Sequence, residues 1–561
     1  MLTNRDLVPK FDVVFLHAPS VYDFRKTAKV YGPIADVIPS TPVFDMYPIG
    51  FFSLASYLSS SGYKIGIVNL AARMLLDKDF DVERAVKGIE AEIFAIDLHW
   101  LVHSHGAIEV AKLVKKYHPN SAVVFGGLSA TIYYEEVLSR YRQIDYVVLG
   151  DTVEVPFKML VEHLLDSRRG LEEVPNLAWR DREAVKTTGI KFVPKSLDEY
   201  AVDYGEVLKI AARGGALSAI PFAGFLKEPI GAVLSYKGCI LNCATCGGSL
   251  CAYASYFSRT YLGVKKPETL VNEVKSIEQY LRVPIFVVGD LQPLGVKWIE
   301  KFVEGLRRER FSSEIIFEFF TPPPLNVLKL LSKASDSVYL QISPETQDEL
   351  LRLKFGRPYD NSSLETFIKR TLSLGFARLD LYFMVGIPAQ TLDSVLAMPN
   401  YVRKLYGLLP RPQRHRLDVF VSPLAPFIDP GSRAFENPRA FGYRLRARTL
   451  EEHRRLLEFS RDWVEMLNYE SDHISRSEIA YAVYQTAREF VKIKAENGVI
   501  SWDQAKETLE RMEMQRNGAF VRSTIDLYPS RRLLRSVRWK LISLMGFRGL
   551  VSIARDLAPL I

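Results

Sequence analysis

Two successive series of short apolar runs, separated by helix-length segments, constrain what this chain can fold into. The runs of the first series lie at 11–19, 63–71, 93–99, 121–127 and 144–151. Between them, segments such as 48–62 and 106–119 repeat apolar residues at helical spacing. Strands that alternate with helices are typical of a parallel sheet with crossover connections. We therefore expect α/β architecture, with a doubly wound, Rossmann-like domain over residues 1–190.

The second series has six apolar runs and predicts a partial βα barrel over residues 231–440. Its expected strands lie at 231–238, 284–290, 314–324, 337–345, 377–388 and 416–426. Residues 191–230 are less regular and are expected to form a connector, whereas residues 441–561 are mostly helical and charged in pattern. In both kinds of sheet, ligands bind at the loops that follow the carboxyl ends of the strands.

Composition excludes several classes of protein. The chain has 561 residues, of which 48% are apolar and 25% charged, as expected of a globular protein with several cores. No apolar run reaches membrane-spanning length, and the charged N-terminal stretch does not resemble a signal peptide. The formal net charge of +8 is mild, and no nucleic-acid-binding module is visible. We expect a cytoplasmic protein that binds no nucleic acid.

Three of the four cysteines, Cys239, Cys243 and Cys246, lie within eight positions, just after the first strand of the second series. Glycines beside them let the backbone wrap closely around a bulky ligand. Three thiolates suit a 4Fe-4S cluster with one iron lacking a protein ligand. Structural zinc is the alternative, although it usually takes four ligands and no second cysteine pair follows. The fourth cysteine, Cys251, is expected to be a small buried residue.

The Cys-x3-Cys-x2-Cys loop, its strand context and the following Gly-Gly resemble the radical SAM superfamily. The resemblance implies that the open iron binds the amino and carboxylate groups of S-adenosylmethionine, and that one electron from the cluster cleaves the sulfonium to give a 5'-deoxyadenosyl radical. It also implies a flavodoxin- or ferredoxin-like electron donor. The residue before the third cysteine is usually aromatic in this family but is Thr245 here, which places the local adenine contact in doubt.

Further strand ends support the same resemblance. By their positions after the barrel strands, it implies contacts to S-adenosylmethionine from Asp290, Ser343, Glu345 and Gly386. Each of these residues could instead be part of a satisfied turn at the end of its strand.

The first domain resembles the cobalamin-binding domain that precedes many radical SAM barrels, and the joint resemblance covers about residues 10–430. It rests on a Pro-x-Gly helix at 48–62, a Gly-Gly-x-x-Ala-Thr loop at 126–131 and an Asp-Tyr-Val-Val-x-Gly strand at 145–150. It implies that cobalamin lies against Asp97, His99, Gly126, Gly127, Ser129, Thr131 and Gly150.

Histidine ligation of cobalt is not expected, because the Asp-x-His-x-x-Gly motif of proteins that use it is absent. Asp97 and His99 could instead hydrogen-bond to the corrin or the substrate, or cap a strand end. His103 and His105 are expected to be capping or surface residues.

The resemblance implies a radical SAM enzyme that activates an unactivated C–H bond, with cobalamin, for methylation or for ring or C–C bond formation. The alternative from another class is a non-catalytic redox or regulatory protein that holds cluster and corrin.

The C-terminal stretch at 531–561 carries seven basic residues against one aspartate, which leaves it at +6. Apolar and basic residues recur on different sides of the expected helix. Such a helix suits peripheral contact with an anionic membrane surface. In that case a lipid or another long apolar molecule is the natural substrate. The alternative is a helix that docks its apolar face on the barrel.

Overall fold

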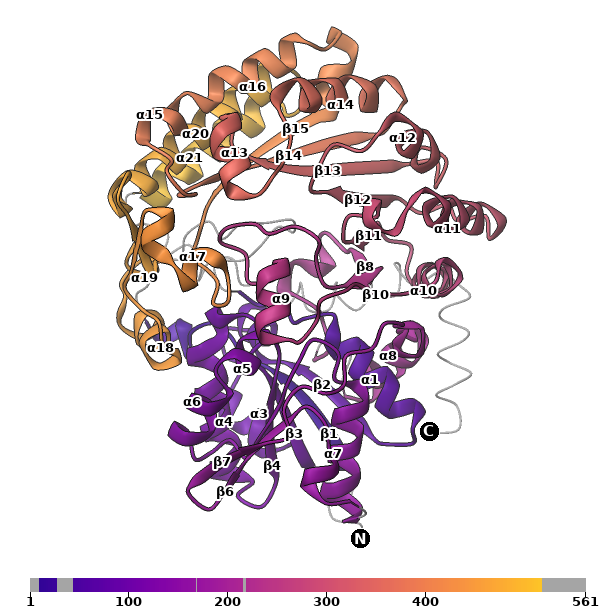
Figure 1. Cartoon of the computed structure of the whole chain (residues 1–561), viewed down its shortest axis with the longest axis vertical. Helices are drawn as coiled ribbons and strands as arrows, with labels where there is room; N and C mark the ends of the chain where they lie inside the picture. Colours follow the sequence, from indigo (N-terminus) through magenta and orange to yellow (C-terminus); the bar gives the residue numbers. More distant parts are fainter. Residues whose placement is uncertain (1–9, 28–43, 168, 215–217, 517–561) are drawn as a thin grey trace.

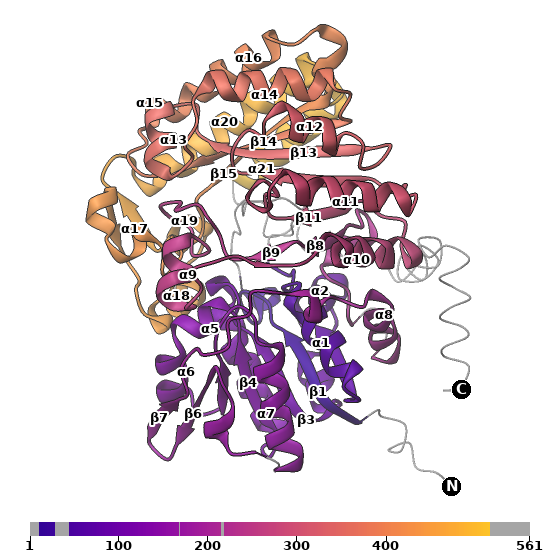
Figure 2. The ribbon, with the colours of Figure 1, turned by 45° about the vertical axis from the view of Figure 1, so that its right-hand side comes forward.

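The structure, a computed structural model, describes residues 10–27, 44–167, 169–214 and 218–516. Two α/β domains are stacked on one another, and α9 (Leu250–Tyr256) lies between them in both views (Figures 1 and 2). Among the described residues, no helix combines the length and apolar character needed to cross a membrane.

The first domain is built on a seven-stranded sheet with the order β2-β1-β3-β4-β5-β6-β7. The first five of these strands pair in parallel, as the sequence predicted, and β6 and β7 add an antiparallel edge. The edge was missed because β6 ends in charged residues and β7, only four residues long, is mostly exposed. The strands are β1 Lys10–His17, β2 Ile65–Asn69, β3 Glu90–Asp97, β4 Ala122–Gly126, β5 Tyr146–Val148, β6 Leu177–Asp181 and β7 Ala184–Thr187.

Helices cover both faces of this sheet, because alternate residues of its strands are apolar and buried. On β1, Val14 and Leu16 pack into the core under α4, whereas Val13 and Phe15 pack into the core under α1 and α7. The helices are α1 Gly50–Ser60, α2 Leu70–Leu76, α3 Val82–Lys87, α4 Ser104–Tyr117, α5 Leu128–Ile132, α6 Tyr134–Arg140 and α7 Glu154–Asp166, with α8 Tyr204–Arg213 in the connector.

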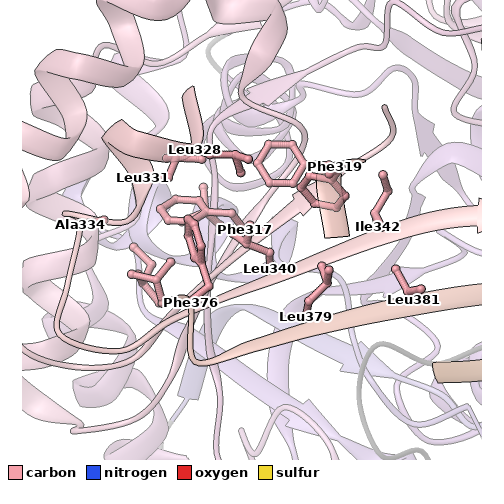
Figure 3. Packing of buried hydrophobic residues seen from close by; sticks show 14 of the residues in the cluster. Phe317, Phe319, Leu328, Leu331, Ala334, Leu340, Ile342, Phe376, Leu379 and Leu381 are labelled. Carbon is pink, nitrogen blue, oxygen red and sulfur yellow. The ribbon is translucent and has the colours of Figure 1, made fainter. Parts of the chain in front are cut away.

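The second domain contains a six-stranded parallel sheet with the order β15-β14-β13-β12-β11-β8. All six expected strands are present, and the sheet is a partial barrel because β8 and β15 remain at its edges. They are β8 Gly231–Leu234, β11 Ile285–Val288, β12 Ile315–Phe319, β13 Val338–Glu345, β14 Arg378–Val385 and β15 Leu417–Pro423. Figure 3 shows phenylalanines of β12 packed against α12 and the neighbouring strands.

Helices cover the outer face of the partial barrel, and a two-stranded sheet, β9 (Tyr236–Lys237) with β10 (Gly263–Val264), flanks the cysteine loop. The helices are α10 Pro267–Tyr280, α11 Val296–Arg308, α12 Leu325–Leu331, α13 Glu349–Phe355, α14 Asn361–Ser373, α15 Leu392–Leu396 and α16 Met398–Gly407.

The C-terminal region packs on both domains and is not purely helical, because β16 (Tyr443–Leu445) and β17 (Tyr469–Ser471) pair within it. Leu450 and Leu457 of α18 join the core of the first domain, whereas Phe490 and Ile493 of α20 join the barrel core. Its helices are α17 Arg433–Glu436, α18 Leu450–Phe459, α19 Trp463–Met466, α20 Arg476–Glu496 and α21 Trp502–Arg516. The basic stretch at 531–561 lies outside the described residues.

A buried ion pair joins the two domains next to the cysteine loop. Arg259 donates from Nε to Asp151 Oδ2 at 2.5 Å and from Nη2 to Asp151 Oδ1 at 3.0 Å. The Arg259 side chain is fully buried, and that of Asp151 is 5% exposed. Lys237 donates to the Asp151 carbonyl oxygen at 2.7 Å. These bonds fix the loop after β5 relative to β9 and the cysteine loop.

We predict that Arg259→Met lowers the free energy of unfolding by about 3–5 kcal/mol, because Asp151 would stay buried without its cation. Urea unfolding followed by circular dichroism measures the change. The double variant Arg259→Met with Asp151→Asn should recover part of the loss, since it removes the uncompensated charge.

Arg142→Met is the matched control, because Arg142 pairs with Glu183 at the surface of the first domain, where both side chains are more than half exposed. This variant should unfold like the wild type. Equal stability of the Arg259→Met and Arg142→Met variants would contradict the prediction.

Candidate functional site

A cavity of about 640 Å³ lies between the two domains, at the carboxyl ends of both sets of strands. The first domain contributes strand ends and loops of β3, β4 and β5, together with the start of α1. The barrel contributes the cysteine loop and the ends of β8, β11, β12 and β13. The site is therefore shared, and neither domain encloses it alone.

The cysteine loop brings three thiols to this cavity. Cys239, Cys243 and Cys246 all line it. Cys246 is exposed and Cys243 buried, but the space that Cys246 faces is the cavity. Cys251 lies on α9 and is absent from the cavity wall; its backbone amide donates to Asn242 Oδ1. Cys251 is partly exposed, so the expectation of a buried residue is wrong.

Close backbone contacts fix the shape of the loop. Ala244 donates to the Phe355 carbonyl oxygen at 2.7 Å, and Gly247 donates to Asp429 Oδ2 at 3.0 Å. Gly356 has a φ of +117°, and a Cβ there would lie 2.9 Å from the Cys243 Cα. Only glycine allows α13 to end so close to the loop.

The thiols lie in a low-dielectric setting with one nearby cation. Burial raises the pKa of Cys239, Cys243 and Cys246. The Arg357 guanidinium opposes this shift at Cys239 and Cys243. Because a bound metal replaces the thiol protons, the cation would stabilise the thiolate form.

Glu345 ends β13 at the cavity wall in an unusual conformation. Its φ is +64°, in the left-handed region that residues other than glycine rarely adopt. Arg357 donates to Glu345 Oε1 from Nη2 at 2.8 Å and from Nε at 3.3 Å. Burial raises the pKa of Glu345, although Arg357 opposes the shift. Backbone strain of this kind collects at functional sites.

The other expected S-adenosylmethionine contacts do not line the cavity. Asp290 accepts hydrogen bonds from Gln292 and from the Phe320 amide, as in a satisfied strand-end turn. Gly386 packs against Tyr469, whose hydroxyl would lie 2.5 Å from an added Cβ. Ser343 is on β13 two residues before Glu345, away from the cavity wall.

On the side of the first domain, five of the seven expected cobalamin contacts line the cavity. These are Asp97, His99, Gly126, Gly127 and Gly150. The Gly-Gly loop passes close to the end of β3, since a Cβ on Gly127 would lie 2.5 Å from the His99 Cα. Burial lowers the pKa of His99 to about 4, so this ring is neutral at pH 7.

Ser129 and Thr131 hold loops together and do not face the cavity. The Ser129 hydroxyl donates to the His99 carbonyl oxygen at 3.1 Å. The Thr131 hydroxyl accepts from the Gly150 amide at 2.9 Å and donates to the Gly127 carbonyl oxygen at 2.9 Å. Thr131 therefore joins the two glycine loops that do line the cavity.

The expectation that His103 and His105 are capping or surface residues is wrong. They are 0% and 5% exposed, and neither side chain caps α4. His105 Nδ1 accepts from the Tyr22 amide, because the segment after β1 packs over the start of α4. Burial lowers the pKa of His103 to about 3.

Sequence reasoning missed several charged residues of the cavity wall, among them Glu318, Asp429, Arg357 and Lys237. Glu318 on β12 accepts from the Gly289 amide at 2.5 Å, and burial raises its pKa to about 7. Burial raises the pKa of Asp429, beside the cysteine loop, to about 6. Arg357 and Lys237 supply the cations. Strand-end position could have indicated Glu318, whereas no local signal marks the others.

The residues of the cavity fit a 4Fe-4S cluster and cobalamin, the two groups that the resemblance of the two domains implies. Three thiols converge on one cavity, as a 4Fe-4S cluster requires. On the opposite wall, an added Cβ on Gly50 would meet nothing within 4 Å and one on Gly126 only a carbonyl oxygen at 4.0 Å, so a bulky ligand can approach their backbone. Apolar side chains of Phe15, Leu54 and Phe157 line the part of the cavity beside these glycines, which we call the apolar crevice.

Comparison with known families also divides the chain into these two domains. Residues 36–156 match the B12 binding domain, and residues 233–402 match the radical SAM superfamily. These two matches assign three cofactors to the chain: a 4Fe-4S cluster, S-adenosylmethionine and cobalamin.

The curated relatives are distant, and each match covers only part of both proteins. The anaerobic magnesium-protoporphyrin IX monomethyl ester cyclase of Synechocystis is 21% identical over 49% of this chain and 51% of that protein. The enzyme of the same name from Cereibacter sphaeroides is 24% identical over 35% and 30%. An uncharacterised methyltransferase of Pyrococcus horikoshii is 27% identical over 36% and 41%. The chain thus spans about a third to a half of the relatives it matches.

Solved structures share the fold. OxsB, a cobalamin-dependent S-adenosylmethionine radical enzyme solved with aqua-cobalamin and S-adenosylmethionine, aligns at a TM-score of 0.54 and 12% identity over 98% of this chain and 84% of that chain. The radical S-adenosylmethionine methyltransferase TsrM from Kitasatospora setae, with cobalamin and a 4Fe-4S cluster, gives 0.51 and 14% over 74% and 75%. With both family matches in the same order along the sequence, the chain belongs to the class of the radical SAM superfamily that carries a B12-binding domain ahead of its barrel.

Proposed function

We propose that this chain is a radical SAM enzyme that activates an unactivated C–H bond of its substrate, for methylation or for ring or C–C bond formation. The observation that carries the proposal is the single cavity onto which three thiols and the glycine loops of the B12-binding domain both open. When bound, the cofactors supply reductive cleavage of S-adenosylmethionine and a methyl or radical carrier. The chain's own residues hold and orient them and exclude water.

Cys239, Cys243 and Cys246 are proposed to hold the cluster, and Arg357 to balance its negative charge. Glu345 is proposed to bind the amine or ribose of S-adenosylmethionine, because both hydrogen bonds from Arg357 go to its Oε1 and leave Oε2 for a ligand. Glu318 stands on the same wall and is a second acceptor. Asp290, Ser343 and Gly386 are proposed to shape the strand ends that support this wall.

Cobalamin is proposed to lie on the first domain, with its corrin towards the cysteine loop. Asp97, His99, Gly126, Gly127 and Gly150 would contact it, and Ser129 and Thr131 would hold the loops that do so. An apolar crevice suits the bulky nucleotide tail of the cofactor, because it removes apolar ring surface from water. The neutral His99 is proposed to hydrogen-bond to the cofactor without ligating cobalt.

The substrate is proposed to be an apolar, small or lipid-like molecule. Two of the relatives named above act on a tetrapyrrole ester by name, and a third is named a methyltransferase. An electron donor of flavodoxin or ferredoxin type would reduce the cluster. We propose a cytoplasmic location with peripheral membrane contact through residues 531–561.

We predict that Cys251→Ala retains about four irons per chain after anaerobic reconstitution, whereas Cys243→Ala loses the cluster. The reason is that only three thiols face the cavity. Iron analysis and the visible absorption spectrum measure the outcome. Loss of iron from Cys251→Ala, or its retention by Cys243→Ala, would refute the ligand assignment.

We predict that the reduced, reconstituted protein converts S-adenosylmethionine to 5'-deoxyadenosine or S-adenosylhomocysteine, detected by chromatography and mass spectrometry. Glu345→Gln should weaken S-adenosylmethionine binding by on the order of tenfold, since it loses a charge-assisted contact.

In the same samples, His99→Ala should leave the absorption spectrum of bound cobalamin unchanged.

A shift of the corrin spectrum in His99→Ala would make His99 the cobalt ligand. A protein that binds cluster and corrin but never cleaves S-adenosylmethionine would instead be the non-catalytic redox or regulatory protein. Failure to retain any corrin would remove the assignment of the cofactor to this chain.

We predict that the full-length protein sediments with anionic vesicles and loses this binding at high salt, because basic residues supply the attraction. A chain that ends at Ser530 should stay in the supernatant and keep its circular dichroism spectrum. Equal binding by both chains, or none by the full-length chain, would make the stretch structural and remove the support for a lipid substrate.

A further inference from the structure

A second group of candidate metal ligands lies at the base of the first domain's half of the cavity. His17 ends β1, Asp97 ends β3, and His103 lies in the 3-10 turn Leu101–His103 before α4. His17 and His103 are fully buried and Asp97 is 4% exposed. One ligand atom of each residue lies within 4.8 Å of those of the other two.

The hydrogen bonds of the two rings fix which nitrogens carry protons. His17 Nδ1 lies 2.8 Å from Asp97 Oδ1, and His103 Nε2 lies 3.1 Å from the Phe44 carbonyl oxygen. Carboxylate and carbonyl oxygens only accept, so each of these nitrogens must donate. In a neutral imidazole, the other nitrogen then carries a lone pair.

These lone pairs have no donor to meet. His17 Nε2, His103 Nδ1 and Asp97 Oδ2 are buried, and no hydrogen-bond partner for them exists within the described part of the chain. The two rings meet edge to face, with their centroids 4.6 Å apart. Burial of electron-pair donors without a proton donor is costly, and a cation between Asp97 and His103 would remove part of this cost.

We propose that His17, Asp97 and His103 bind one divalent transition metal ion, with Zn²⁺ as the favoured ion. Two imidazoles and one carboxylate form a ligand set that suits zinc and related ions. Metal bonds of about 2.0–2.2 Å hold ligand atoms about 3–4 Å apart. The ion would take the place of the proton between His17 Nδ1 and Asp97 Oδ1, which lie 2.8 Å apart, with the ring proton on Nε2 instead. His103 Nδ1 would be the third ligand atom.

Three protein ligands leave a coordination position open. Asp97 also lines the large cavity, so the open position is available to a water molecule or to a donor atom of a cavity ligand. The ion would thereby connect the ends of β1 and β3 to whatever occupies the first domain's half of the cavity. This site is separate from the three thiols on the barrel side.

The experiment uses the full-length protein with its cluster and corrin in place, so that the thiols are occupied. The protein is passed over a chelating resin, equilibrated with a slight excess of zinc, dialysed, and analysed for iron, cobalt and zinc by mass spectrometry. The wild type should hold about one zinc per chain, whereas occupancy in His103→Asn and Asp97→Asn should fall by on the order of tenfold.

His118→Asn is the matched control. His118 belongs to the same domain, its Nε2 also meets a backbone carbonyl oxygen, that of Val86, and it stacks on Phe94 away from the proposed ligands. This variant should keep the wild-type zinc content. Circular dichroism shows whether each variant folds.

Absence of zinc uptake by the folded wild type, or full uptake by folded His103→Asn and Asp97→Asn, would overturn the proposal. If those variants do not fold, X-ray absorption at the zinc edge of the wild type decides: nitrogen and oxygen ligands support the site, whereas sulfur ligands overturn it. Iron and cobalt counts in the same samples keep this outcome distinct from that of the proposed function.

Discussion

The buried pair between Arg259 and Asp151 is the interaction on which the geometry of the cavity depends. Asp151 follows Gly150, which lines the cavity on the first domain, and Arg259 follows α9, which leads out of the cysteine loop. One ion pair thus ties the two walls within a few residues of their functional groups. Neither charge could be buried alone, so the loop after β5 and the segment after α9 must fold against each other.

The C-terminal region braces the same arrangement from the side. The Glu136 carboxylate accepts from the amides of Leu450 and Glu451 and thereby caps α18 on the first domain. Tyr443 and Tyr469 donate to carbonyl oxygens at the ends of β14 and β15 in the barrel. One segment therefore contacts both domains. Gly386 has to be glycine because a side chain there would collide with Tyr469 of this segment.

Periodicity along the chain was enough to predict the parallel strands of both sheets, because buried parallel strands are near-continuous apolar runs. The spacing of the cysteines predicted that their thiols lie together, because all three residues are close in the sequence. Long-range partners were beyond such reasoning. Glu318 with the Gly289 amide, Arg357 with Glu345, and His17 with Asp97 meet only after folding. Asp290 was expected to face a ligand for the same reason. Its position at a strand end does not reveal that the Gln292 and Phe320 amides already use both carboxylate oxygens.

The two walls differ in chemistry, and this difference bears on how substrate enters. Glu318, Glu345 and Arg357 make the barrel wall polar, whereas Phe15, Leu54 and Phe157 make the crevice of the first domain apolar. The nucleoside of S-adenosylmethionine and the nucleotide tail of cobalamin would therefore meet walls of different polarity. Separating the domains would break the Arg259–Asp151 pair, the hydrogen bond from Lys237 to the Asp151 carbonyl oxygen and the packing of α18 on the first domain. Because these contacts would be lost together, we expect substrate to enter through a gap between side chains of the closed arrangement.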